Sequence, residues 1–257
     1  MPWKKFPYPD PSYSYTAADL KKNWARLHAG DAEALVQDPA LLEAWSAYHC
    51  GEFEKAAKLG LKQGMDGYAV ANKATSIYAN YLEPSADKKR ALFEEVTARC
   101  EQQQAERPDE ASGYYWHAYA LGRYAQGISI IEALAQGIGN TVKRSLDMTI
   151  KLAPKHADAH IALGVYHAEI IDKVGALIGS LTYGAKKELG IAMFQKALEL
   201  NPESAIARIE YADALIMFCG KKKMPEALAL YREAAGFTPK DAMERLDVQK
   251  AISELED

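Results

Sequence analysis

Three fourteen-residue segments of this chain align with one another without gaps, and each ends in a proline. They read TVKRSLDMTIKLAP at 141–154, LGIAMFQKALELNP at 189–202 and EALALYREAAGFTP at 226–239. Each has an apolar or aromatic residue eight positions before its proline and a small residue five positions before it, so both lie on one side of a helix. Proline then ends the helix, because its ring cannot continue it. The chain therefore contains three copies of one helix, each ended by a proline.

A second helix is expected before each of these segments. The centres of these partner helices read ALGRY at 120–124, ALGVY at 162–166 and YADAL at 211–215. A residue with little or no side chain in a helix centre lets another helix cross closely, so we predict crossings at Gly122, Gly164 and Ala212. Helical hairpins of this kind stack, because one hairpin cannot bury its apolar face alone. The predicted fold class is an all-α solenoid of about five or six hairpins.

The rest of the chain also reads as helices. We expect an opening helix over 16–30, a hairpin over 41–64, a long helix over 87–107 and a capping helix over 241–255. Residues 1–15 form an arm rich in proline and aromatic residues, which we expect to dock on a neighbouring subunit, to pack on the first hairpins of its own chain or to be mobile. Residues 16–257 are then a single repeat domain without strands.

The spacing of the prolines shows that two hairpins are enlarged. Pro108 to Pro154 is 46 residues and Pro154 to Pro202 is 48, whereas Pro202 to Pro239 is 37. Against a repeat of about 34 residues, the hairpins near 109–153 and 156–201 therefore carry insertions. If each insertion is shared between the two helices of its hairpin, it lengthens both by about two turns. The glycines of the second insertion either allow close packing or end helices.

Both insertions are apolar, in the stretches QGISIIEALAQGIGN and DKVGALIGSLTYGAKKELG. So many apolar side chains are unusual in a solvated loop. The insertions therefore either pack together as an extra core layer, or wall an apolar ligand pocket, or form an oligomer contact. The residues that we predict for such a pocket are Ile131, Leu134, Leu177, Ile178, Leu181 and Tyr183.

The repeated motif resembles the tetratricopeptide repeat (TPR). That repeat carries the pattern W-x2-L-G-x2-Y, then A-x3-F-x2-A, then P, and the middle unit places Leu163, Gly164, Phe194, Ala197 and Pro202 in these slots. With the stretch YYWHAYALGRYAQG and the final cap, the chain from about 45 to 255 resembles the family of the regulator of microtubule dynamics proteins and of the T-component proteins of tripartite periplasmic transporters. The resemblance implies a non-catalytic scaffold, with protein association in the first group and ligand handling in the second.

The TPR resemblance also implies a binding surface. In TPR-like hairpins the first helix lines a concave groove, and we predict that this groove binds a protein or peptide. An apolar small-molecule or lipid-binding accessory protein is the alternative function. For Ile161, Val165 and Ile209 the alternative is plain core between repeats. The predicted groove residues are Trp116, Tyr119, Arg123, Gln126, Ile161, Val165, Ile209, Asp213 and Ile216.

The sequence offers no catalytic constellation. His156 and His160 lie four residues apart in HADAH, but the stretch is not HExxH and no carboxylate is placed to activate a bound water. His160 and His167 fall on slots that packing aromatic residues normally fill, so we interpret them as core histidines. No serine, cysteine or threonine lies in a nucleophile elbow. We therefore predict no enzyme activity, no metal and no cofactor.

Charge and cysteine content limit the partners and the compartment. The net charge is −4 and the one basic run, Lys221 to Lys223, is short, which disfavours nucleic acid. The three cysteines are scattered, which favours buried thiols in a reducing compartment. No apolar run approaches the roughly 20 residues of a membrane span. If Met1 is the natural start we expect a cytoplasmic protein; a removed leader would change that expectation.

Overall fold

The computed structural model describes residues 2–256, and within them it contains α-helices and short 3-10 helices but no strand. The side chains of Ile130, Ile131 and Leu134 lie outside this description. The predicted all-α fold class is confirmed. The α-helices are α1 (Ala17–Leu27), α2 (Pro39–His49), α3 (Phe53–Lys62), α4 (Tyr68–Tyr81), α5 (Ala86–Glu106), α6 (Ala111–Gln126), α7 (Ile130–Ala135), α8 (Ile138–Leu152), α9 (Ala157–Val174), α10 (Ala176–Tyr183), α11 (Lys187–Leu200), α12 (Ala205–Cys219), α13 (Met224–Ala235) and α14 (Ala242–Glu256). The 3-10 helices are η1 (Pro11–Tyr13), η2 (Gly64–Gly67) and η3 (Gly220–Lys223).

The repeated proline marks the end of one hairpin and the start of the next. Two residues after Pro154, the imidazole of His156 caps α9 by accepting a hydrogen bond from the backbone N–H of Ala159 at 3.1 Å. Two residues after Pro202, Ser204 Oγ does the same for α12 with the N–H of Ala207, also at 3.1 Å. Each cap satisfies a backbone donor that the first helical turn leaves without a partner.

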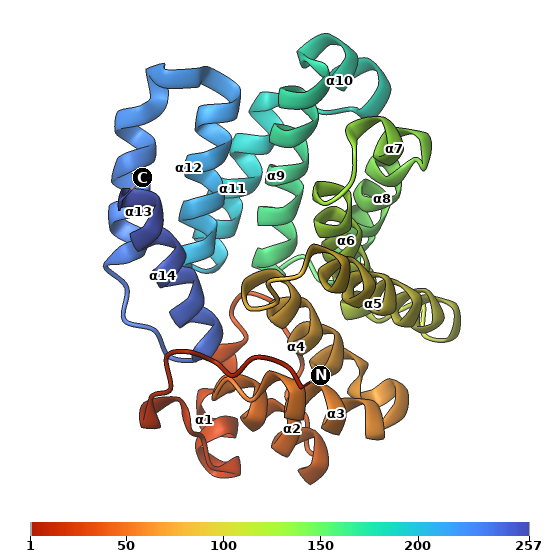
Figure 1. The fold of residues 1–257 in the computed structure, drawn as a ribbon, viewed down its shortest axis with the longest axis vertical. Helices are drawn as coiled ribbons and strands as arrows, with labels where there is room; N and C mark the ends of the chain where they lie inside the picture. The colour runs from red at the N-terminus through yellow and green to blue at the C-terminus, as the bar shows by residue number, and fades with distance from the viewer. Residues whose placement is uncertain (1, 257) are drawn as a thin grey trace. The chain divides into compact units, whose positions relative to one another are not determined.

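The contacts group the helices in two compact units (Figure 1). Unit 1 comprises Met1–His28, Glu33–Leu152 and Lys240–Met243, and unit 2 comprises Ala29–Ala32, Ala153–Pro239 and Glu244–Asp257. In unit 1, helices α2 to α6 each pack on the next, and α8 packs on α6. In unit 2, α9 packs on α10, α11 and α12, and α12 packs on α13. The single repeat domain over 16–257 stays a prediction.

The two insertions form short helices of their own, α7 and α10, so they are not simply shared between the two helices of each hairpin. In the second insertion the glycines decide this outcome. Gly175, at φ 81°, separates α9 from α10, and Gly184, at φ 64° in the left-handed region, ends α10. Such backbone angles suit glycine because it has no Cβ. The alternative in which glycines end helices is therefore confirmed for Gly175 and Gly184.

The predicted helix crossing is present at Gly164 but absent at Gly122. A Cβ at Gly164 would lie 2.7 Å from the ring of Phe194, which is fully buried, so α9 and α11 approach too closely there for any larger residue. Among the described residues, a Cβ at Gly122 would meet nothing within 4 Å. Gly122 therefore occupies the glycine position of the TPR-like motif, but no helix that the structure describes crosses α6 closely at this residue. Ala212 is fully buried in the core of unit 2.

The N-terminal arm packs on the first hairpins of its own chain, which confirms one of its three alternatives. The ring of Trp3 stacks on Tyr78 of α4 at a centroid distance of 4.1 Å. The backbone N–H of Trp3 donates to Glu54 Oε2 at 3.1 Å, and that of Lys4 donates to the Tyr78 hydroxyl at 3.2 Å. These bonds join the arm to α3 and α4.

Unit 1 also contains the four residues Lys240–Met243 from near the end of the chain. In α2, His49 Nδ1 lies 2.7 Å from Asp241 Oδ2, and both side chains are buried. The Tyr48 hydroxyl donates to the sulfur of Met243 at 2.8 Å, and the Tyr15 hydroxyl donates to the carbonyl of Lys240 at 2.8 Å. The N-terminal hairpin therefore holds a segment that lies about 190 positions later in the sequence.

Candidate functional site

The strongest candidate site in unit 1 is a row of four predicted groove residues along α6. Trp116, Tyr119, Arg123 and Gln126 follow one another at three- or four-residue spacing, so they share a face of the helix. The rings of Trp116 and Tyr119 meet at a centroid distance of 5.4 Å. The Arg123 guanidinium lies 5.3 Å from the centre of the Tyr119 ring, and its Nη1 donates to Gln126 Oε1 at 3.1 Å. We call these four residues the α6 row.

Exposure increases along the α6 row. Trp116 is buried, Tyr119 and Arg123 are half-buried, and Gln126 is exposed. The buried ring of Trp116 packs against Tyr119. Tyr119, Arg123 and Gln126 reach the surface of unit 1. The cation–π contact holds the guanidinium against the ring, which limits the directions in which its donors can point.

The predicted groove residues of α9 lie in a core. Ile161 is buried against Phe194 and Ala207, and Val165 packs against the same cluster. That cluster joins α9, α11 and α12. The alternative of plain core between repeats therefore describes Ile161 and Val165, and we do not include either residue in the proposed site.

In the last hairpin the capping helix α14 covers the face of α12 that we assigned to a partner. Ile209 is fully buried in a cluster with Val248 and Ala251 of α14, and Ile216 packs against the same cluster. A terminal helix takes this position because the last hairpin of an array otherwise exposes its apolar face. We therefore do not include Ile209, Asp213 and Ile216 in the proposed site.

Asp213 takes part in a polar cluster under α14. It accepts a hydrogen bond from the Tyr231 hydroxyl of α13, and Lys250 of α14 lies 4.0 Å from it. Lys250 also lies 3.6 Å from Glu210. Burial raises the pKa of the Asp213 carboxyl, and the hydrogen bond from Tyr231 partly opposes that rise. These contacts hold α12, α13 and α14 together.

The residues predicted to wall a pocket differ in their positions. Leu177, Ile178 and Leu181 of α10 are 74%, 55% and 80% exposed. Tyr183 is half-buried, and its carbonyl accepts a hydrogen bond from the Tyr166 hydroxyl at 3.0 Å. The side chains of Ile131 and Leu134 lie outside the described residues. The apolar pocket between the insertions stays a prediction.

The three histidines of unit 2 are buried and hydrogen-bonded, in agreement with the core interpretation. His156 caps α9, and His160 Nε2 lies 3.1 Å from the carbonyl of Pro154. His167 Nδ1 accepts from the backbone N–H of Lys186 at 3.3 Å. Among the described residues, no three His, Cys, Asp or Glu side chains come together as metal ligands.

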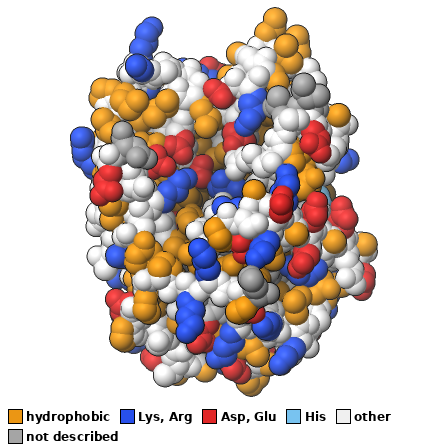
Figure 2. All heavy atoms as spheres, in the orientation of Figure 1, with side chains coloured by type: hydrophobic (Ala, Val, Ile, Leu, Met, Phe, Trp, Pro, Cys, Tyr) orange, Lys and Arg blue, Asp and Glu red, His pale blue; other side chains and the backbone are white. Residues whose placement is uncertain are grey.

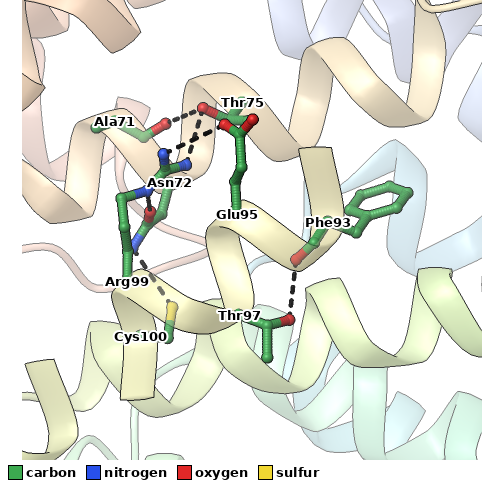
Figure 3. Close-up of polar contacts among 8 residues, drawn as sticks. All are labelled: Ala71, Asn72, Thr75, Phe93, Glu95, Thr97, Arg99 and Cys100. Atoms are coloured by element: carbon green, nitrogen blue, oxygen red, sulfur yellow. Dashed lines mark hydrogen bonds and ion pairs between the residues drawn. The ribbon is translucent and has the colours of Figure 1, made fainter. Parts of the chain in front are cut away.

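A buried polar network between α4 and α5 was not predicted from the sequence (Figure 3). Arg99 Nε donates to Asn72 Oδ1 at 2.8 Å, and its Nη2 donates to Thr75 Oγ1 at 3.3 Å. Asn72 Nδ2 in turn donates to the sulfur of Cys100 at 3.4 Å. Burial lowers the pKa of Arg99 and raises that of the Cys100 thiol. The thiol is therefore a poor nucleophile, and the network serves to join two helices.

His117 of α6 is a second buried group that the sequence did not single out. Its Nδ1 lies 2.9 Å from Ser145 Oγ of α8, and its Nε2 lies 3.8 Å from Glu101. Desolvation lowers the pKa of His117, and the largely exposed Glu101 opposes this only in part. The folded protein therefore favours the neutral imidazole.

We expect His117 to make the protein acid-sensitive. The pKa of His117 is lower in the folded state than its ordinary value of about 6.5, so the folded state binds fewer protons and the free energy of unfolding falls as the pH drops below that value. One such group contributes a slope of at most about 1.4 kcal/mol per pH unit. Urea unfolding of the parent and of His117→Asn between pH 7 and pH 5 measures it. Equal slopes in the two proteins would contradict the assignment.

The arrangement of helices is similar to that of a solved TPR structure. The crystal structure of a thermophilic TPR protein of Thermus thermophilus matches with a TM-score of 0.58 at 19% sequence identity, over 83% of this chain and 97% of that chain. No protein-family model matches the sequence. A search of curated proteins also finds no match. The predicted TPR-like fold is confirmed, and the finer resemblance to regulators of microtubule dynamics and T-components stays a prediction.

No helix in the described part of the chain combines the length and the apolar character that a membrane crossing requires.

Proposed function

We propose that this protein is a non-catalytic TPR-like scaffold that binds a protein or peptide through the α6 row. The observation that carries the proposal is the contact of Arg123 with the face of Tyr119, on a helix whose other faces pack against α5 and α8. The TPR fold supports a role in protein association, because stacked hairpins present extended surfaces for binding. The residue types support it further, since tryptophan, tyrosine and arginine dominate binding energy at protein interfaces.

The chemistry of the α6 row indicates a partner that offers a carboxylate beside an apolar group. The guanidinium presents several donors in one plane and pairs well with a carboxylate. Tyr119 is half-buried beside it and provides apolar area with little loss of conformational freedom on binding. Gln126 lies at the exposed end of the row and can donate and accept hydrogen bonds.

The test compares quantitative pull-downs with the parent chain and with Tyr119→Ala/Arg123→Ala. We expect the affinity for the recovered partner to fall by about thirtyfold or more, which corresponds to the loss of one hot spot. The matched control is Tyr8→Ala/Arg232→Ala, which removes an exposed tyrosine and an exposed arginine elsewhere. Circular dichroism of each variant checks that the helices are intact.

A partner that binds the Tyr119→Ala/Arg123→Ala variant as tightly as the parent would overturn the placement of the site. The Arg123→Lys variant separates charge from shape, because lysine keeps the positive charge but lacks the planar fork of donors. We expect Arg123→Lys to bind more weakly than the parent and more tightly than the double variant.

A further inference from the structure

The second insertion contains an uncharged stretch bracketed by lysines. From Val174 to Ala185 the sequence reads VGALIGSLTYGA, without a charged residue. Lys173 precedes this stretch, and Lys186 and Lys187 follow it. Apolar segments flanked by lysines are typical of chains that lie at a membrane surface, because the long side chains can reach the headgroups while the apolar residues enter below them.

Helix α10 presents the apolar residues of this stretch outward from unit 2. Its inner face packs on α9 through Gly179, where a Cβ would lie 3.3 Å from Ile170 and 3.6 Å from Ile171. Its outer face carries Leu177, Ile178 and Leu181, at 74%, 55% and 80% exposure. The glycine on the inner face seats α10 closely against α9, while its large apolar side chains remain exposed.

A second group of lysines lies at the same end of unit 2. Lys187 Nζ donates to the sulfur of Cys219 at 2.9 Å, so the start of α11 lies against the end of α12. The basic 3-10 helix η3 follows Cys219 directly, and its Lys221 and Lys222 are exposed. Figure 2 shows the apolar side chains over α10 and the basic side chains over the α12–α13 turn at this end of unit 2.

The charge at this end differs in sign from that of the whole chain. The two turns and their flanking residues carry six lysines, which are Lys173, Lys186, Lys187, Lys221, Lys222 and Lys223. Four acidic residues lie among them, Glu169, Asp172, Glu188 and Glu226. Six minus four leaves +2, in a chain whose net charge is −4. Glu169 pairs with Lys173 and Glu226 pairs with Lys223, and each of these pairs is neutral as a whole.

We propose that this end of unit 2 docks on an anionic lipid membrane, with the outer face of α10 inserted at the headgroup boundary and the lysines on the headgroups. An apolar helix face and a basic patch at the same end of one unit are suited to such a surface. Leu177 and Leu181, at 74% and 80% exposure, protrude from the unit. A protein partner needs a surface of matching shape around them, whereas a fluid bilayer adapts to a protruding helix.

The experiment is flotation of the full chain with phosphatidylcholine vesicles, with and without phosphatidylserine. We expect binding to the vesicles that contain phosphatidylserine, and weaker binding to phosphatidylcholine alone or at high salt, because salt screens the lysines. Leu177→Ser/Ile178→Ser/Leu181→Ser should reduce binding by about tenfold or more, since it removes the inserted apolar area. Lys221→Glu/Lys222→Glu should also reduce it.

Matched controls are Leu35→Ser/Leu61→Ser, which changes exposed leucines of unit 1, and Lys22→Glu/Lys62→Glu, which changes exposed lysines there. Both should bind vesicles as the parent does. The variant Leu181→Trp adds a direct readout, because an indole that enters the bilayer shifts its fluorescence emission to shorter wavelength.

Absence of binding to phosphatidylserine vesicles would overturn the proposal, as would equal binding by the triple serine variant. A parent chain that ignores vesicles but sediments as a dimer, and becomes monomeric in the triple serine variant, would also overturn it and assign α10 to self-association. None of these outcomes depends on the α6 row, which lies on a different helix.

Discussion

Replacing Phe194 by alanine should destabilise the protein by about 3–5 kcal/mol, the usual range for removing a buried phenylalanine. Phe194 is fully buried in the cluster between α9, α11 and α12, and its ring stacks on that of Tyr211 at 5.1 Å. The buried neighbours Ala168, Ala197 and Ala207 are too small to fill the space that the ring leaves. The cavity therefore stays open, and the full cost of the lost contacts remains.

The contact between Phe194 and Gly164 gives this prediction a second, independent measurement. Alone, Gly164→Ala should cost about 1–3 kcal/mol, because its new methyl group would lie 2.7 Å from the ring. In the Phe194→Ala background the ring is gone, and the same substitution should become favourable by up to about 1 kcal/mol through helix propensity. Urea unfolding of the parent, both single variants and the double variant measures the coupling. Additive effects would contradict the close crossing.

Replacing Gly67 by alanine should destabilise unit 1 by about 3 kcal/mol, at the upper end of the range for overpacking. A Cβ at Gly67 would lie 2.0 Å from the carbonyl oxygen of Gly60 in α3. In the other direction, a Cβ at Gly60 would lie 2.7 Å from the carbonyl oxygen of Gly67. The obstacle is backbone in both cases, so no side-chain rotation can relieve it. The start of α4 must move away from α3 instead.

The matched control for Gly67→Ala is Gly122→Ala, which should change the free energy of unfolding in the opposite direction. Gly122 lies inside α6, and a Cβ there would meet no atom of the described part of the chain within 4 Å. Alanine should therefore stabilise the protein by up to about 1 kcal/mol, because it restricts the unfolded chain and favours the helix. The midpoint of urea unfolding measures both variants. A destabilised Gly122→Ala protein would show that another element lies over α6 at this position.

The helices themselves could be predicted because their signals are local. Proline stops, the caps that follow them and the period of apolar residues all lie within a few positions of the helix that they define. The predicted opening helix 16–30 corresponds to α1, the hairpin 41–64 to α2 and α3, the long helix 87–107 to α5 and the cap 241–255 to α14. The error at Gly122 shows the limit of a motif, because a motif position does not say how near the partner helix comes.

The candidate site could be predicted only in part, because exposure depends on contacts between distant residues. The spacing of Trp116, Tyr119 and Arg123 predicts one shared helix face, and their side chains do contact one another along α6. The same spacing places Ile209 on the matching face of α12, where α14 covers it. Nothing near Ile209 in the sequence indicates where the last helix docks. The sequence therefore cannot distinguish a motif position that is exposed from one that another helix covers.

The contacts between the first hairpin and Lys240–Met243 can form only late in synthesis on the ribosome. His49 is synthesised 192 positions before its partner Asp241. Until Asp241 is synthesised, the imidazole of His49 lacks the carboxylate that it contacts in the folded protein, where both side chains are buried. Loop closure over such a distance is slow compared with contacts inside a hairpin. The N-terminal hairpins can therefore form during translation, but they reach their final packing only after Lys240–Met243 has left the ribosome.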